Sequence, residues 1–140
     1  MTTESQLQLA GCIILDKTGR ILLLHRNTAK RQQWEIPGGK IEKGEEAATA
    51  AVREVKEELG VAVSINKFLG EKAFTEDNFT MHYYWYIADI NSGKVRIMET
   101  QTFDDLKYFS SADLEATYDA LSPNTQNLYK FLQENPRGIV

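Results

Sequence analysis

Residues 39–61 read GKIEKGEEAATAAVREVKEELGV, and this stretch decides most of what the sequence says about fold and function. Written as spacing, it is G-x5-E-x7-R-E-U-x-E-E-x-G-U, where U is a bulky aliphatic residue. Seven positions of this pattern carry a fixed residue type: Gly39, Glu45, Arg53, Glu54, Glu57, Glu58 and Gly60. The last glutamates are spaced as neighbours on a helix, so the pattern describes a helix with a defined acidic face.

The segment from Glu45 to Leu59 is predicted to be an α-helix. It contains no proline or glycine and is rich in Ala, Glu and Lys, which are good helix formers. Gly60 follows directly and predicts a left-handed cap that ends the helix. One stripe of the helix is apolar and should face a core: Ala48, Val52, Val55 and Leu59.

Three glutamates lie together on another face of this helix, roughly 130° from the apolar stripe. Glu54, Glu57 and Glu58 are related by i, i+3 and i+4 spacing, so their charges repel one another. They also lie near the helix C-terminus, where the helix dipole disfavours negative charge. One interpretation is a solvated acidic face. The interpretation that we favour is a site for Mg²⁺ or Mn²⁺, which bind hard oxygen ligands.

The segment before the helix, residues 34–40, reads WEIPGGK. Pro37 with the paired glycines predicts a turn in which the backbone is exposed. This turn and the helix together resemble the signature of the Nudix hydrolase family, with a match at every fixed position. The resemblance implies an α/β/α sandwich with a mixed sheet, a central helix and a C-terminal helix. It also implies metal-dependent hydrolysis of a nucleoside diphosphate linked to another group.

The resemblance assigns a metal site to the acidic face. It implies that the carbonyl of Gly38 joins Glu54, Glu57 and Glu58 around the cation. Glu54 is either a metal ligand or the general base, and the sequence leaves both roles open. Other candidates for the base or for a further acidic ligand lie beyond the helix: Glu99, Asp104 and Asp105.

Arg53 and Glu45 are implied to hold the turn and the helix together, in support of the chemistry of Glu54. The signature itself is specific for the diphosphate and its metal, whereas the base and the leaving group are recognised elsewhere.

The substrate is inferred from the rest of the chain, which resembles the MutT-like nucleoside triphosphate pyrophosphohydrolases, including those that act on 8-oxo-dGTP. The proline, Ser-Gln-Pro-Trp-like and tyrosine markers of three other Nudix subfamilies are missing downstream of the helix. Four residues are the predicted substrate contacts: Arg26, Gly39, Lys40 and Asn124. Alternatives left open are a nucleotide sugar or RNA cap as substrate, and a nucleotide sensor that does not turn over.

Length and composition fit a small enzyme. The 140 residues are expected to form one domain, 1–140, and 42% hydrophobic with 26% charged residues is ordinary for a globular protein. The net charge of −4 argues against general nucleic-acid binding. No signal-peptide pattern or long apolar run is present, so we expect a cytoplasmic monomer or homodimer with no membrane partner.

The remaining segments predict a sheet and two further helices. Predicted strands cover residues 7–15, 21–25, 61–68, 81–90 and 95–98. Asp16 to Gly19 predicts a hairpin-type turn, and Cys12 is expected to be buried. Ser110 with Asp113 predicts a capping box for a helix to about residue 120, and Ser122-Pro123 predicts the start of the last helix.

Overall fold

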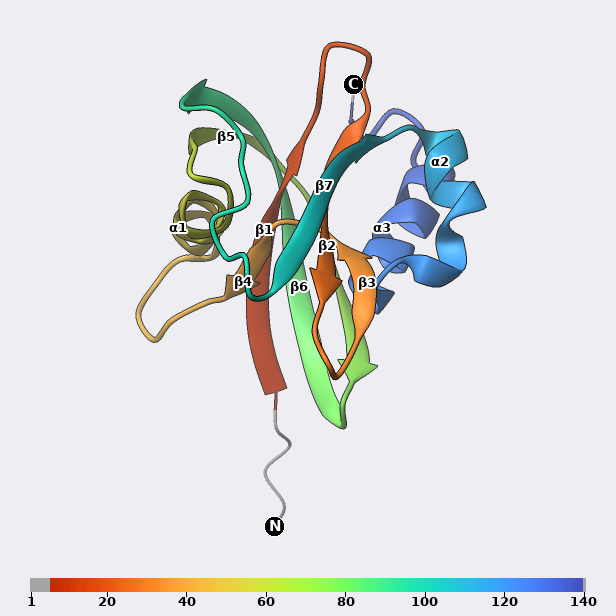
Figure 1. Cartoon of the computed structure of the whole chain (residues 1–140), viewed down its shortest axis with the longest axis horizontal. Coiled ribbons are helices and arrows are strands. Elements are labelled where there is room, and N and C mark those ends of the chain that lie inside the picture. Colours follow the sequence, from red (N-terminus) through yellow and green to blue (C-terminus); the bar gives the residue numbers. More distant parts are fainter. Residues whose placement is uncertain (1–5, 140) are drawn as a thin grey trace.

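The computed structural model describes residues 6–139, and in it two β-sheets lie between helices on opposite sides (Figure 1). The elements in chain order are β1 (Gln6–Ile14), β2 (Ile21–Asn27), β3 (Gln32–Glu35), β4 (Gly38–Lys40), α1 (Ala47–Leu59), β5 (Ala62–Glu76), β6 (Phe79–Ser92), β7 (Phe103–Phe109), α2 (Ser111–Ala116), the 3₁₀ turn η1 (Tyr118–Ala120) and α3 (Pro123–Glu134). Helix α1 covers one side, and α2 and α3 cover the other. The expected α/β/α sandwich is therefore confirmed.

The strands form two sheets rather than one. In the first, the order is β4-β1-β6-β5, with β1 parallel to β6 and antiparallel to β4. Strands β5 and β6 form a long antiparallel hairpin in this sheet. The second sheet is antiparallel, in the order β3-β2-β7. The mixed sheet that we expected is the first of the two.

The turn between β1 and β2 forms where it was predicted, but its strands leave for different sheets. The Gly19 N–H donates to the Asp16 carbonyl at 3.0 Å, and Gly19 has a φ of +82°. Beyond the turn only Leu15 and Ile21 pair across it. The last five residues of β1 and the first four of β2 are buried on both faces. Each therefore lies inside the sandwich rather than in a hairpin at its surface.

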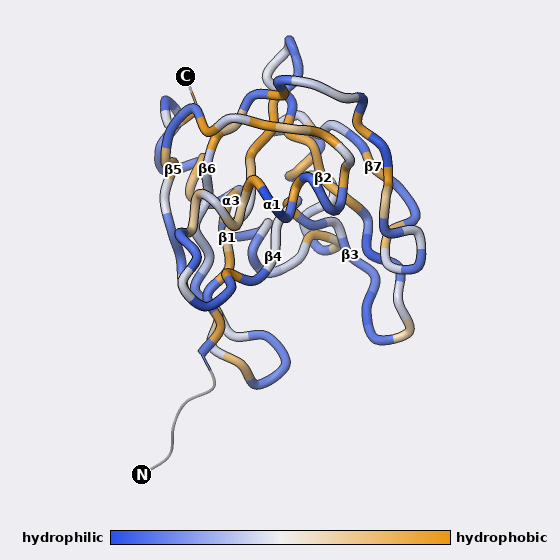
Figure 2. The backbone as a smooth tube through the Cα atoms, turned by 90° about the vertical axis from the view of Figure 1, so that its left-hand side faces the viewer, coloured by the Kyte–Doolittle hydropathy of each residue, from blue (hydrophilic) through white to orange (hydrophobic). Residues whose placement is uncertain are grey.

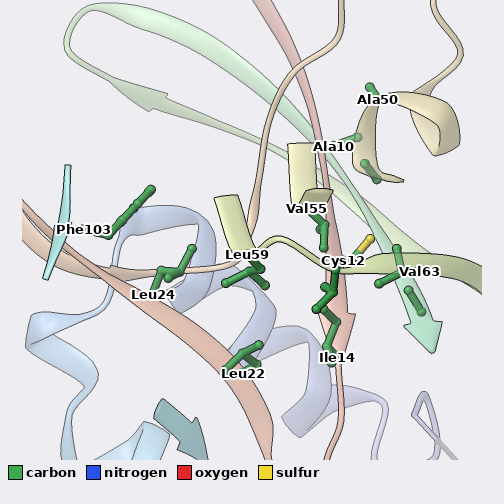
Figure 3. Packing of buried hydrophobic residues seen from close by; sticks show 13 residues of the cluster. Ala10, Cys12, Ile14, Leu22, Leu24, Ala50, Val55, Leu59, Val63 and Phe103 are labelled. Carbon is green, nitrogen blue, oxygen red and sulfur yellow. The ribbon is translucent and has the colours of Figure 1, made fainter. Parts of the chain in front are cut away.

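Two hydrophobic cores result, one on each side of the sheets. The core under α1 contains Cys12, Ile14 and Val55, as Figure 3 shows. The core under α2 and α3 contains Ile13 and Trp85. Because successive strand residues point to opposite faces, β1 supplies both cores from adjacent positions. In Figure 2 the hydrophobic stretches accordingly gather in the strands at the centre, and the loops at the periphery are mainly hydrophilic.

Helix α1 begins two residues later than predicted and ends where predicted. Glu46 is its N-cap, and Gly60 closes it with φ +70° and an N–H bond to the Lys56 carbonyl. Val55 and Leu59 are buried as expected. Ala48 and Val52 are only half-buried, because the buried face is centred on a different set: Ala50, Ala51, Val55, Glu58 and Leu59.

The strand predicted at residues 95–98 is wrong, because the backbone there serves the end of α1. The N–H of Arg96 donates to the Leu59 carbonyl at 3.1 Å, and that of Met98 donates to the Glu58 carbonyl at 2.9 Å. The last carbonyls of a helix have no partner within it, so this segment satisfies two of them. Strand β7 follows it and was not predicted.

Helices α2 and α3 begin as predicted. Ser110 and Asp113 form both bonds of a capping box, and Ser122 caps α3 by accepting from the Thr125 N–H at 3.1 Å. Helix α2 ends at Ala116 and continues only as the 3₁₀ turn. No helix within residues 6–139 is long and apolar enough to span a membrane.

Candidate active site

The glycines of the predicted turn form the short strand β4, which lies against both β1 and the acidic helix. Neither Gly38 nor Gly39 has a positive φ, so conformational freedom does not explain them. Space does. A Cβ on Gly38 would collide with the Tyr83 hydroxyl and the Ala10 carbonyl, and one on Gly39 would collide with the Glu54 carboxylate. The backbone of β4 thus lies directly against the groups that we expect to be functional.

Glu58 is the buried member of the acidic face, with 6% exposure. Its Oε1 accepts a hydrogen bond from the Gly38 N–H at 2.8 Å, which joins the helix to β4. Burial raises the pKa of Glu58 well above its ordinary value; the Gly38 N–H opposes this, and the charges of Glu54 and Glu99 add to it. Burial likewise raises the pKa of Glu54. The site therefore holds an excess of negative charge in a partly desolvated place.

Arg53 connects the parts of the site. Its guanidinium donates to Glu45 at 2.8 and 3.0 Å, to the Lys40 carbonyl at 3.0 Å and to Glu54 at 3.1 Å. The bond from Arg53 holds the pKa of Glu45 at about 2. Arg53 therefore links the end of β4 to Glu45 and to α1, as the bracing role predicted for Arg53 and Glu45 requires. Arg53 also holds Glu54 in position.

The donor set fits a divalent cation by its chemistry. Glu54, Glu57 and Glu58 are all hard oxygen donors beside the open backbone of β4, and the raised pKa of Glu58 marks a charge that a cation would offset. Within residues 6–139, no group of three or more His, Cys, Asp or Glu side chains forms a ready-made metal cluster. Arg53 instead bridges Glu54 and the half-exposed Glu57, at 3.1 and 3.3 Å.

The alternative acidic residues lie in different surroundings. Glu99 acts on the pKa values of both Glu54 and Glu58, so its charge is close to the acidic face. Asp104 is bound by His25 and Asn27, each at 2.7 Å. The carboxylate of Asp105 accepts from the Leu106 N–H.

A pocket of about 280 Å³ opens beside β4, and we call it the β4 pocket. Its walls include the apolar residues Leu9, Ile36, Phe74 and Met81 and the polar residues Arg26, Arg31, Glu35, Gly38, Gly39, Lys40, Glu76, Tyr83, Ser122 and Asn124. All four predicted substrate contacts therefore line one pocket. Its volume lies just below the usual range of small-ligand sites, which begins at about 300 Å³.

Arg26 and Asn124 are held firmly in this pocket. Arg26 donates to both oxygens of Glu35, at 2.7 and 3.1 Å, and its guanidinium lies 5.3 Å from the centre of the Phe103 ring. Asn124 is 6% exposed, and its Oδ1 accepts from the Trp85 indole N–H at 2.9 Å. Arg26 is thus not a free solvated charge.

The family assignment follows from comparison with known proteins. A model of the NUDIX domain matches residues 7–134. This chain belongs to the NUDIX domain family. The putative 8-oxo-dGTP diphosphatase of Bacillus subtilis is 30% identical over 93 residues, which cover 66% of this chain and 60% of that protein. The RNA pyrophosphohydrolase of Dinoroseobacter shibae is 43% identical over 61 residues, covering 44% and 38% respectively.

A solved structure agrees with this Nudix assignment. The MutT NUDIX hydrolase from Burkholderia pseudomallei superimposes with a TM-score of 0.81 at 27% identity, and 92% of this chain and 99% of that chain are covered. The chain spans less than two thirds of the length of the two sequence relatives above.

Sequence reasoning missed several residues of this Nudix site. Glu35 and Tyr83 line the β4 pocket, and Trp85 orients Asn124, yet none was singled out as part of the site. Successive side chains of β6 point to opposite faces of the strand. Tyr83 and Trp85 form the core face, and it is this face that borders the pocket, while Tyr84 and Tyr86 lie on the α1 side.

Proposed function

We propose that this chain is a Mg²⁺-dependent pyrophosphohydrolase that converts a nucleoside triphosphate, most favourably an 8-oxo-dGTP-like purine nucleotide, to its monophosphate and pyrophosphate. The observation that carries the proposal is the contact between the acidic face of α1 and β4 at one edge of the β4 pocket. Phosphates lying over β4 would meet the acidic face, while the base enters the pocket. Mn²⁺ is expected to substitute for Mg²⁺.

Each residue of the acidic site has a defined task in this proposal. Glu57 and Glu58, with the Gly38 carbonyl, would hold the cation, and Glu54 binds it or accepts the proton of the attacking water. The cation, when bound, neutralises phosphate charge and stabilises the leaving group. Arg53 holds Glu54 in position through its bond at 3.1 Å.

The part of the proposal that concerns the substrate rests on the β4 pocket. Arg26 and Asn124 would contact the base, and Lys40 lines the same pocket. The Bacillus subtilis relative named as a putative 8-oxo-dGTP diphosphatase supports this choice. A panel of 8-oxo-dGTP, dGTP, dCTP and ADP-ribose with Mg²⁺, read out by pyrophosphatase-coupled phosphate release, tests it.

The expected result of that panel is turnover of the purine triphosphates, loss of turnover in excess EDTA and recovery with Mg²⁺ or Mn²⁺. Full turnover in excess chelator would refute the metal mechanism. Turnover of ADP-ribose alone would refute the triphosphate assignment. A chain that binds these nucleotides and hydrolyses none of them would be a sensor instead of an enzyme.

A second substrate, 5′-triphosphorylated RNA, is favoured by one specific observation. A hollow of about 290 Å³ adjoins the β4 pocket, and four cationic side chains line it: Arg26, Lys30, Arg31 and Lys40. Asp77 pairs with Lys30 and Arg31, and Glu35 pairs with Arg26, so three of these four charges are already offset. Release of pyrophosphate from a triphosphorylated oligonucleotide, compared with free GTP at equal concentration, would decide between the two substrates.

A further inference from the structure

Two loops from different sheets meet beside the β4 pocket, at the same end of the molecule (Figure 1). One is loop 28–31, which connects β2 to β3 in the second sheet. The other is the turn of Asp77 and Asn78, which connects β5 to β6 in the first sheet. At the start of β2, a backbone bridge between Leu15 and Ile21 joins the two sheets. At the end of β2, side chains of the two loops make the connection.

The connection depends on Arg31, whose guanidinium binds two carboxylates of the β5–β6 hairpin. It donates to Glu76 at 3.1 Å and forms an ion pair with Asp77, which also pairs with Lys30 at 3.2 Å. We call Arg31, Glu76 and Asp77 the clasp. Their side chains are 22%, 17% and 34% exposed, so water and salt screen their attraction less than at an open surface.

Both loops are tight, which fixes where these charged groups lie. The Thr28 N–H donates to the Arg31 carbonyl at 3.0 Å, and the Arg31 N–H donates to the Thr28 hydroxyl at 3.3 Å, so loop 28–31 is closed at its base. In the hairpin turn, Asp77 and Asn78 have φ values of +54° and +67°. Two successive residues with positive φ are typical of the two-residue turn that matches the twist of a hairpin.

The clasp separates the β4 pocket from the hollow of about 290 Å³ beside it. Arg31 lines both spaces, whereas Glu76 lines the pocket and Asp77 lines the hollow. Without the clasp, the hairpin turn would lose its tie to loop 28–31, and this wall of the pocket would lose its support. The wall belongs to the space where we expect the nucleotide, and it is separate from the acidic face of α1.

We propose that Arg31 is a positioning residue for the nucleotide, which acts through Glu76 and Asp77 to hold the hairpin turn against loop 28–31 and so keeps the β4 pocket closed on this side. A pocket that is formed only part of the time binds with an apparent affinity reduced by the fraction formed. Loss of the clasp should therefore weaken nucleotide binding and leave the chemical step unchanged. This inference rests on the proposed function, because it takes the β4 pocket as the nucleotide site.

The decisive variant is Asp77→Gly, because Asp77 lies outside the lining of the β4 pocket and acts on it through the clasp. Glycine adopts the positive φ of this position without strain. The matched control is Asn78→Gly, which changes the same turn at an uncharged residue. We expect Asp77→Gly to raise KM for dGTP about two- to fivefold, the worth of one partly exposed ion pair, with kcat within about twofold of wild type. Asn78→Gly should leave both values unchanged.

A double-mutant cycle separates positioning from direct phosphate contact. If Arg31 itself bound a phosphate, removal of Asp77 would free its guanidinium and KM would fall, and this result would overturn the inference. In an Arg31→Met background, Asp77→Gly should change KM by less than about twofold, since both substitutions remove the same ion pair. The full effect of Asp77→Gly in that background would overturn the inference as well.

Calorimetric binding of dGMP to the same variants separates this inference from the proposed function, because it needs no turnover. Binding that is two- to fivefold weaker in Asp77→Gly than in Asn78→Gly supports the role of Arg31, even if the wild-type protein hydrolyses no triphosphate. Turnover of dGTP by the wild type, with unchanged KM and unchanged dGMP affinity in Asp77→Gly, would overturn the inference and leave the proposed function intact.

Discussion

Replacement of Gly39 by alanine is the sharpest test of the site, because the structure gives the size of the disturbance. The new Cβ would collide with the carboxyl group of Glu54, whose two oxygens would lie 2.6 and 2.7 Å from it. Ordinary van der Waals contact begins at 3.4 Å, so the carboxylate must retreat by about 0.7 Å or more. A catalytic group misplaced by about 1 Å costs on the order of 10²-fold in rate.

We therefore expect Gly39→Ala to lower kcat by about 10²-fold while the protein stays folded. The Glu54 carboxylate is the far end of a flexible side chain, and moving it off a preferred rotamer costs only about 1 kcal/mol. The melting temperature should fall by no more than a few degrees. Steady-state kinetics with dGTP and Mg²⁺, together with thermal unfolding monitored by circular dichroism, would measure both quantities.

The matched control is a double-mutant cycle with Glu54→Asp, whose shorter side chain leaves room for the new Cβ. If the collision causes the loss, Gly39→Ala should cost much less in the Glu54→Asp background than in the wild type, since neighbouring substitutions are not additive. Wild-type kcat in Gly39→Ala would refute the reasoning. An equal loss in both backgrounds would mean that Gly39 acts on the substrate and not through Glu54.

Three further predictions concern single residues. Glu54→Gln should lower kcat by about 10²–10⁴ if Glu54 is the general base, without loss of fold, and unchanged kcat would exclude both of its proposed roles. Asn124→Ala should lower kcat/KM for a purine nucleotide more than for dCTP and should lower the melting temperature, because the Trp85 N–H loses its acceptor; equal losses for both bases would contradict base contact. Although desolvation opposes it, bonds from Arg20 and Thr18 hold the pKa of Asp16 at about 2, so Asp16 stabilises the fold above its unfolded pKa near 4 and loses this effect as pH falls toward 2. Urea unfolding of Asp16→Asn should therefore show a deficit relative to wild type at pH 7 that vanishes near pH 2, and a constant deficit would rule out this ionic origin.

Local signals in the sequence predicted the helices well. The end of α1 was predicted from Gly60, and the starts of α2 and α3 were predicted from a capping box and from Ser122-Pro123. All of these signals act within four residues. Arg53 also contacts Glu54 and Glu57 of the same helix, two contacts that were not predicted.

Contacts between segments that are far apart in the sequence could not be predicted. The segment 95–98 reads as a strand, but its N–H groups bind carbonyls at the end of α1, and nothing within the segment announces this. In the sequence Glu58 cannot be distinguished from the other glutamates of the acidic face. In the structure it is buried and accepts a hydrogen bond from the Gly38 N–H of β4. The bond between Asn124 and Trp85 joins residues 39 positions apart. Each of these depends on which elements meet in three dimensions.

The parallel pairing of β1 with β6 has a consequence for how the site comes into being. Gln6 pairs with Thr80 and Ile14 with Ala88, a separation of 74 residues in each case. Closing so long a loop is slow, and contacts of this kind limit the folding rate. Strand β4 joins the sheet through β1, and Tyr83 joins it through β6, so the pocket between them arises only once this closure is complete. A nucleotide should consequently bind only the fully folded protein. Its binding should therefore raise the free energy of global unfolding. Ligand-induced protection from hydrogen exchange should then extend to the slowest-exchanging amides of β1 and β6, far beyond the residues that a nucleotide would touch.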